Sequence, residues 1–190
     1  MPALSPALSI VGLAGNITSP SKTRALVATA LDLASQRLDA RTELFEIADF
    51  GEDLGRARRL SDLSEPARAR VEALLAADAL VVATPIYKGS YPGLFKHLID
   101  LLDPAAFLRK PVLIAATGGG ERHALAVEHQ LRPLFAFFEA RVLSTAVHVS
   151  DRDFTDGRLT GTAALERLGR AVEEFELIFP AARALQHAAE

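Results

Sequence analysis

The 190-residue chain has no cysteine. Disulfides, thiolate metal sites and cysteine nucleophiles are therefore excluded. The absence suits a reducing compartment, and we expect a cytoplasmic protein. The segment Met1–Gly15 lacks the basic residues that begin a secretory signal peptide. The sequence also lacks an apolar run of the roughly 18 residues that a membrane helix needs, so we expect no membrane partner.

A strong excess of charge of one sign is also missing. The chain has 21 Lys and Arg against 24 Asp and Glu, a formal net charge of -3. This balance argues against a basic surface for nucleic acid, and no nucleic-acid partner is expected. The five histidines lack the spacing of a metal-binding helix, so no metal is expected either. With 49% apolar residues, we expect residues 1–190 to form a single domain.

Short apolar runs alternate along the chain with stretches of helical spacing. The runs are continuously apolar, as strands buried on both faces must be. The order predicts an α/β fold, a five-stranded parallel sheet with helices on both faces. The expected strands are Leu8–Ala14, Thr42–Ile47, Ala79–Thr84, Pro111–Ala116 and Arg141–Val149. The expected helices are Ser21–Leu38, one that starts at Ser64–Pro66, Pro92–Leu102, Glu121–Ala140 and Thr162–Ala189. Surface loops are expected at Asp49–Leu60 and Asp151–Gly157.

Ligands of open parallel sheets bind beyond the carboxyl ends of the strands, where the strand order reverses. The loop Gly15–Thr23 joins the first strand to a helix start and is rich in hydroxyl groups. Its backbone amides and the positive helix end suit a phosphate. The alternative is an ordinary Ser/Thr cap of the helix.

Two further loops follow the third and fourth strands. The segment Thr84–Gly93 holds both tyrosines of the chain and suits a flat ligand; a proline-shaped turn is the alternative. In Thr117–Gly120, three glycines allow the backbone to approach a ligand closely, although a flexible turn would use them equally. Three such loops at neighbouring strand ends are more specific than any one of them.

Together these loops resemble those of the NAD(P)H-dependent FMN reductase family. Within it, the chain is most similar to the flavin reductases of two-component alkanesulfonate and methanesulfonate monooxygenase systems. The resemblance runs from Ile10 to about Val149. It rests on the motifs LAGNITSPSKT at 13–23, PIYKGSYPGLFK at 85–96 and ATGGGERHALAVEHQLRP at 116–133.

The resemblance implies a flavodoxin-like fold and an enzyme that transfers hydride from NADPH or NADH to N5 of FMN. Reduced FMN would then pass to a partner flavin-dependent monooxygenase. It implies a phosphate site of Asn16, Thr18, Ser21, Lys22 and Thr23, a ring and ribityl site of Pro85, Ile86, Tyr87 and Lys88, and contacts to the pyrimidine edge from Thr117, Gly118 and Gly119. No catalytic side chain is implied, because the cofactor performs the hydride transfer.

Two departures from the family pattern concern the phosphate site. Asn16 stands where the family usually has Ser, and Thr18 where it often has Arg, which leaves Lys22 and Arg24 as the nearest cations. Two alternatives share these loops: a quinone, azo or metal-ion reductase that holds FMN tightly, and a non-enzymatic flavodoxin-type electron carrier. The modest net charge counts against the carrier. The choice between NADPH and NADH stays open.

The expected helix Glu121–Ala140 contains a proline. Pro133 has no N–H, so the carbonyl of His129 loses its i+4 partner, and a π-bulge would let it reach the N–H of Leu134. The sulfonate reductases that this chain resembles carry an aromatic insertion in this helix beside a subunit contact, and His129 stands at the matching position. The helix has more apolar residues than one core-facing stripe needs. We therefore expect a homo-oligomer, a homotetramer, with a proline kink inside a monomer as the alternative.

Overall fold

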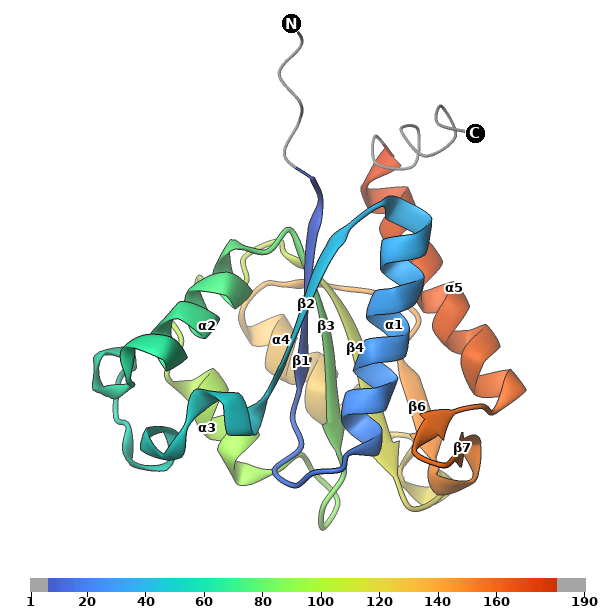
Figure 1. The fold of residues 1–190 in the computed structure, drawn as a ribbon, viewed down its shortest axis with the longest axis horizontal. Helices are drawn as coiled ribbons and strands as arrows, with labels where there is room; N and C mark the ends of the chain where they lie inside the picture. The colour runs from blue at the N-terminus through green and yellow to red at the C-terminus, as the bar shows by residue number, and fades with distance from the viewer. Residues whose placement is uncertain (1–6, 181–190) are drawn as a thin grey trace, which may run out of the picture.

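The computed structural model describes residues 7–180 and is built on a parallel sheet (Figure 1). The strands are β1 (Ser9–Ala14), β2 (Arg41–Glu46), β3 (Ala79–Pro85), β4 (Pro111–Gly118), β5 (Arg141–Val142) and β6 (Val147–Ser150). Their order is β2-β1-β3-β4-β5, and β6 also pairs with β4, so β5 and β6 share the fifth position. This order is the flavodoxin-like one, and it reverses between β1 and β3. The predicted fold class is confirmed.

The fifth position of the sheet is interrupted. We expected one strand over Arg141–Val149, but residues 143–146 leave the ladder. The carboxylate of Glu174 accepts the backbone N–H groups of Ser144 and Thr145 at 2.8 and 2.7 Å. A side chain from a distant helix thus takes the place of a strand partner and satisfies the backbone there.

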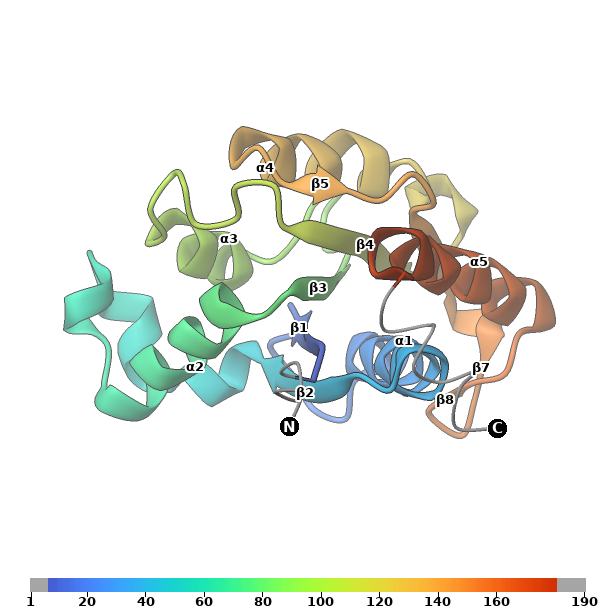
Figure 2. The same cartoon turned by 90° about the horizontal axis from the view of Figure 1, so that it is seen from above.

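Helices cover both faces of the sheet (Figure 2). The helices α1 (Lys22–Leu38) and α5 (Thr162–Ile178) lie on one face, and α2 (Glu65–Ala76), α3 (Gly93–Asp100) and α4 (Arg132–Phe137) lie on the other. Alternate residues of the central strands enter opposite cores: Val81 packs with α1 and α5, and Val82 with the other helices. Burial on both faces explains why these strands are continuously apolar. The expected end of the last helix, Ala189, lies outside the described residues.

The expected helix Glu121–Ala140 is not continuous. It consists of a 3-10 turn η4 (Glu121–His123), a π-helix η5 (Val127–Leu131) and α4. The expected π-bulge is therefore confirmed, but the bond Arg132 N–H to Val127 O places it just before Pro133 instead of across it. Proline sits at the first turn of α4, where its missing N–H costs the helix little.

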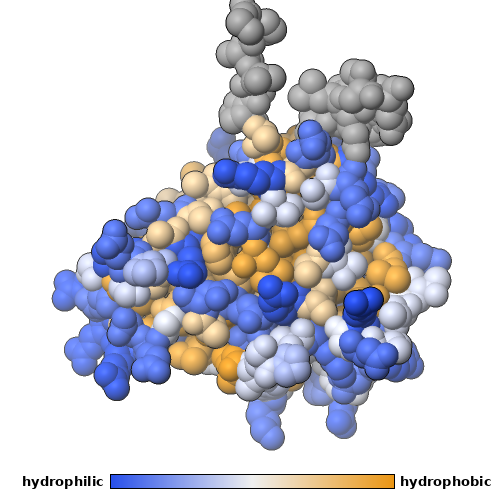
Figure 3. Space-filling view, in the orientation of Figure 1, coloured by the Kyte–Doolittle hydropathy of each residue, from blue (hydrophilic) through white to orange (hydrophobic). Residues whose placement is uncertain are grey.

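The two expected surface loops contain short elements. The segment 49–60 includes parts of the 3-10 turns η1 (Ile47–Phe50) and η3 (Leu60–Asp62) and all of η2 (Glu52–Arg56). The segment 151–157 begins with η6 (Asp151–Asp153) and enters a small hairpin of β7 (Phe154–Thr155) and β8 (Arg158–Leu159). On the face shown in Figure 3, apolar side chains are exposed over β2. A shallow groove there is lined by Phe45 and by Ala69 and Ala73 of α2.

Candidate functional site

The loops that follow β1, β3 and β4 meet beyond the carboxyl ends of these strands, at the lower end of the molecule in Figure 1. They enclose an open cavity of about 350 Å³, which lies within the size range of small-molecule sites. Eleven of the twelve predicted site residues line it, and Lys88 does not. The lining residues are Asn16, Thr18, Pro20, Ser21, Lys22, Thr23, Pro85, Ile86, Tyr87, Thr117, Gly118, Gly119 and Asp151.

The loop after β1 leads into the N-terminus of α1. Ser21 is the N-cap residue, and its hydroxyl accepts the N–H of Arg24 at 3.2 Å. Ser21 therefore both caps the helix and lines the cavity. The backbone N–H groups of Lys22 and Thr23, at the start of the helix, have no hydrogen-bond partner within it. Gly15 begins the loop because an added Cβ would lie 2.9 Å from the buried ring of Phe95.

Two buried polar atoms near the cavity lack a partner. Asn16 is only 3% exposed, and its Nδ2 donates to the carbonyl of Thr18 at 3.1 Å and to Glu46 Oε2 at 3.4 Å. Its Oδ1 has no hydrogen-bond partner, and neither has Nε2 of His148. Within residues 7–180 these are the two buried side-chain atoms in that condition. Unsatisfied buried groups are rare in folded proteins; Asn16 lines the cavity, and His148 lies behind Gly118, which also lines it.

A pair of buried hydroxyl groups joins the first loop to the third. Oγ1 of Thr23 lies 2.7 Å from Oγ1 of Thr117, and both residues are buried. Thr23 was expected to bind phosphate. Its hydroxyl already has a partner here, so the pair fixes α1 against the end of β4.

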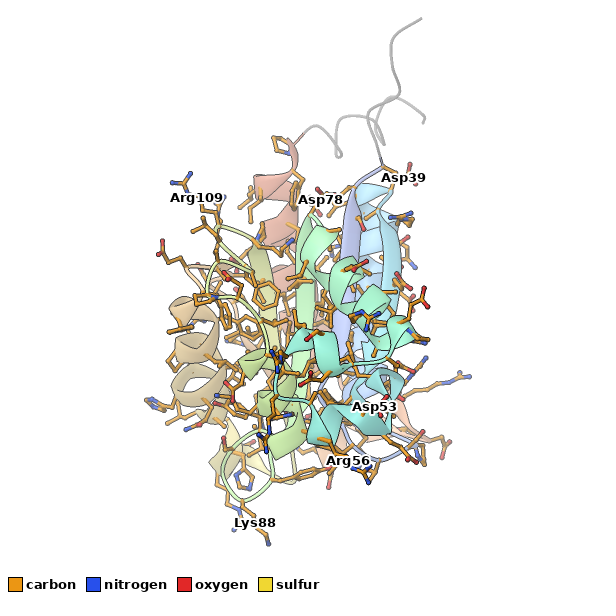
Figure 4. The ribbon with its side chains drawn as sticks, turned by 90° about the vertical axis from the view of Figure 1, so that its left-hand side faces the viewer. Asp39, Asp53, Arg56, Asp78, Lys88 and Arg109 are labelled. Atoms are coloured by element: carbon orange, nitrogen blue, oxygen red, sulfur yellow. The ribbon has the colours of Figure 1, made fainter. Side chains whose placement is uncertain are left out.

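The loop after β3 closes on itself. Tyr87 and Ser90 exchange both backbone hydrogen bonds, at 2.8 and 3.1 Å, so Lys88 and Gly89 form the tip of a two-residue turn. Lys88 has a φ of 54° and projects from that tip (Figure 4), and it is not among the residues that line the cavity. The structure therefore does not bring Lys88 together with Pro85, Ile86 and Tyr87 at the cavity wall, and its role as a ring and ribityl contact stays a prediction. Tyr91 packs its ring on Phe95, with centroids 5.6 Å apart, and belongs to the core.

The loop after β4 has one crowded glycine, Gly118, and two open ones, Gly119 and Gly120. A Cβ on Gly118 would lie 3.0 Å from His148 Nε2 and 3.1 Å from His123 Cβ, whereas a Cβ on Gly119 would meet nothing within 4 Å. The histidines thus support the loop from behind, and its open side faces the cavity. Burial, and then the neighbouring His123, lower the pKa of His148, so its neutral form is favoured.

Both cations nearest the first loop are paired with carboxylates. Lys22 Nζ lies 2.8 Å from Asp151 Oδ1, and Arg24 Nε lies 3.2 Å from Glu46 Oε2. Asp151 lines the cavity but was not among the predicted site residues, because it begins a polar segment expected to be a surface loop. Its place directly after β6, at the carboxyl edge of the sheet, is the signal that would have found it.

Residues 8–154 match the family model described as NADPH-dependent FMN reductase. The chain belongs to this family. It is 42% identical to an NADH-dependent FMN reductase, SfnF, of Pseudomonas fluorescens, over 90% of this chain and 92% of the relative. It is 40% identical to the NADH-dependent FMN reductase SfnE of Pseudomonas putida, over 98% and 100%. The crystal structure of an oxidoreductase from Corynebacterium diphtheriae is similar with a TM-score of 0.81 and 31% identity, covering 90% and 95% of the two chains.

The predicted family, enzyme class and pair of FMN with a nicotinamide nucleotide are thereby confirmed. The cavity fits FMN on its own evidence: helix-start amides and hydroxyls suit the phosphate, and Gly119 leaves backbone open to a flat ring. Among the described residues, no three His, Asp or Glu side chains are grouped to hold a metal ion. None of the helices described is long and apolar enough to cross a membrane.

Proposed function

We propose that the protein reduces FMN with NADH or NADPH in the cytoplasm and releases the reduced flavin to a partner flavin-dependent monooxygenase. The observation that carries this proposal is the cavity formed by the three flavin-type loops. Release of reduced FMN is supported by the similarity to SfnF and SfnE, whose names match the flavin reductases of sulfonate monooxygenase systems. The loop Gly15–Thr23, the proposed phosphate loop, supports release of the flavin too. Its nearest cations, Lys22 and Arg24, are already paired with carboxylates, and a loop without an unpaired cation holds a phosphate dianion weakly.

The proposed contacts divide the cavity into two parts. Thr18, the Ser21 hydroxyl and the amides of Lys22 and Thr23 hold the phosphate, while Pro85, Ile86 and Tyr87 lie along the ring and ribityl chain. When bound, FMN supplies the hydride-accepting N5 atom. Gly118 and Gly119 line the cavity where we place the pyrimidine edge, and the open backbone of Gly119 can donate a hydrogen bond to the negative charge that reduction places there. The protein therefore binds and orients, and no side-chain acid or base is assigned.

Substitution of Ser21 by Ala tests the phosphate contacts. The change removes a hydrogen bond to a charged group, worth about 1.5–3 kcal/mol at most. FMN affinity should fall roughly tenfold, and riboflavin affinity should stay near the wild-type value. Ser35→Ala, in the same helix but far from the loop, is the matched control. Equal losses for FMN and riboflavin would contradict the phosphate site.

The colour and kinetics of the purified protein distinguish release of FMN from its retention. If FMN is released, dialysed protein is colourless, and the rate of NADH oxidation saturates with added FMN. A yellow protein whose rate ignores added FMN would favour the alternative of a tightly bound flavin that reduces a quinone, an azo compound or a metal ion. A protein that does not oxidise NADH or NADPH at all would favour the electron carrier.

We further propose a homotetramer that uses the surface around η5 and α4. Leu125 and Phe137 are large apolar side chains that are 65% and 67% exposed. Exposed apolar side chains grouped on one surface are typical of a protein–protein interface. A hydrogen bond of 3.0 Å from Ser90 Oγ to Gln130 Oε1 ties this region to the loop after β3. Light scattering that gives the mass of a monomer would overturn the assembly and leave the reductase activity untouched.

A further inference from the structure

The phosphate loop, Gly15–Thr23, and the first turn of α1 together carry no unbalanced positive charge, although they include Lys22 and Arg24. Lys22 is the one cation among the described residues that line the cavity, and its Nζ is bound to Asp151. Arg24 is bound to Glu46, whose carboxylate also accepts from Asn16. Each positive charge near the helix start is therefore matched by a negative one.

Asp151 differs from Glu46 in its position. Asp151 itself lines the cavity, so a phosphate at the N-terminus of α1 shares that space with a carboxylate. The carboxylate reaches the loop from the end of β6, 129 residues further along the chain than Lys22. The phosphate and Asp151 are then two anions beside one ammonium group, and the like charges repel each other.

We propose that Asp151 is a specificity-determining residue that weakens the binding of flavin phosphate by competing for Lys22. The inference rests on the proposed phosphate site. Asp151 opposes only ligands that carry a phosphate, so it lowers the preference for FMN over riboflavin and favours exchange of FMN with solution. The side chains of Lys22 and Asp151 are 43% and 66% exposed, so their pair contributes little to folding.

The test is the substitution Asp151→Asn in the full chain, with dissociation constants for FMN and riboflavin measured by quenching of flavin fluorescence. FMN should bind about fivefold more tightly, which equals about 1 kcal/mol, and riboflavin should be unchanged. Because the variant loop is positive, its FMN affinity should also fall more steeply with salt than that of the wild type. Asp156→Asn, an equal change of charge at the exposed β7–β8 turn outside the cavity, is the control and should alter neither constant.

A second pair of variants separates the local charge from a change of loop shape. Lys22→Gln leaves Asp151 unpaired beside the phosphate, so FMN affinity should fall, and adding Asp151→Asn should restore most of it. Unchanged or weaker FMN binding in the Asp151→Asn variant would overturn the inference, as would an equal gain for riboflavin. If Ser21→Ala weakens FMN selectively in that case, the phosphate site stands and only the role of Asp151 fails. If Ser21→Ala acts equally on both flavins, the site and the inference fall together.

Discussion

The buried hydroxyl pair Thr23–Thr117 offers a direct test of how the flavin loops are held together. Valine has nearly the shape of threonine but no hydroxyl, so each substitution removes one member of the pair with little change of volume. Thr23 is 2% and Thr117 8% exposed, so each hydroxyl depends mainly on the other for its hydrogen bond. The four proteins to compare are the wild type, Thr23→Val, Thr117→Val and the double variant.

The expected energies follow from the geometry. The two oxygen atoms lie 2.7 Å apart, a good hydrogen bond between neutral groups. Either single variant leaves a buried hydroxyl without its partner, which costs about 1–3 kcal/mol of unfolding free energy. The double variant leaves no orphan and should lose only about 1 kcal/mol. The coupling between the two positions, the sum of the two single losses less the loss in the double variant, is therefore about 1–5 kcal/mol.

Urea unfolding of the flavin-free protein, followed by circular dichroism, measures these energies, provided that the slope with urea stays constant. Thr29→Val is the control, because its hydroxyl donates to Ala25 O within α1, at 2.9 Å, and does not contact Thr117. Combined with Thr117→Val, it should give additive losses. If Thr23→Val and Thr117→Val also add to within about 0.5 kcal/mol, the hydroxyl pair does not couple the two loops and the reasoning is wrong.

Two other substitutions follow from the crowding behind the loops. Gly15→Ala should cost about 1–3 kcal/mol in urea unfolding, because its Cβ would press on the ring of Phe95. Gly119→Ala has open space and should unfold like the wild type; equal midpoints for the two variants would refute the comparison. His148, with its pKa lowered by burial and then by His123, stabilises the fold fully above its unfolded pKa near 6.5 and loses that contribution as pH falls through the lower folded pKa. His148→Gln should therefore reduce the loss of Tm between about pH 7 and about pH 5.5, and an unchanged loss would contradict this role.

The parts of the fold that could be predicted from the sequence are those that local patterns determine. Continuous apolar runs such as Ala79–Thr84 predict strands buried on both faces, and the structure confirms this one as β3. Polar and glycine-rich loops at strand ends predict where the site lies, because parallel strands bring their carboxyl ends to one edge. Pro133 predicted a disturbance of helical bonding, and a π-helix ends next to it.

The features that the sequence did not predict arise where contacts with other parts of the chain decide the local structure. The break in the fifth strand depends on Glu174, which lies 30 residues beyond Ser144. The Asp151 carboxylate reaches the cavity because the sheet places the end of β6 beside α1; its position after the last strand puts it at the right edge of the sheet, but its pairing with Lys22 depends on the fold. The outward position of Lys88 depends on a turn closed by Tyr87 and Ser90, which is visible only once the backbone bonds are known.

The interrupted fifth position also affects how the molecule meets its copies. An outermost strand presents unpaired N–H and C=O groups, on which a second chain can add a strand and begin aggregation. Here that edge consists of two short pieces, two and four residues long, separated by a segment whose backbone amides are occupied by Glu174. A foreign strand that paired with β5 would have to stop at residue 143. The break in the fifth position therefore leaves a second chain little continuous backbone to pair with at this edge of the sheet.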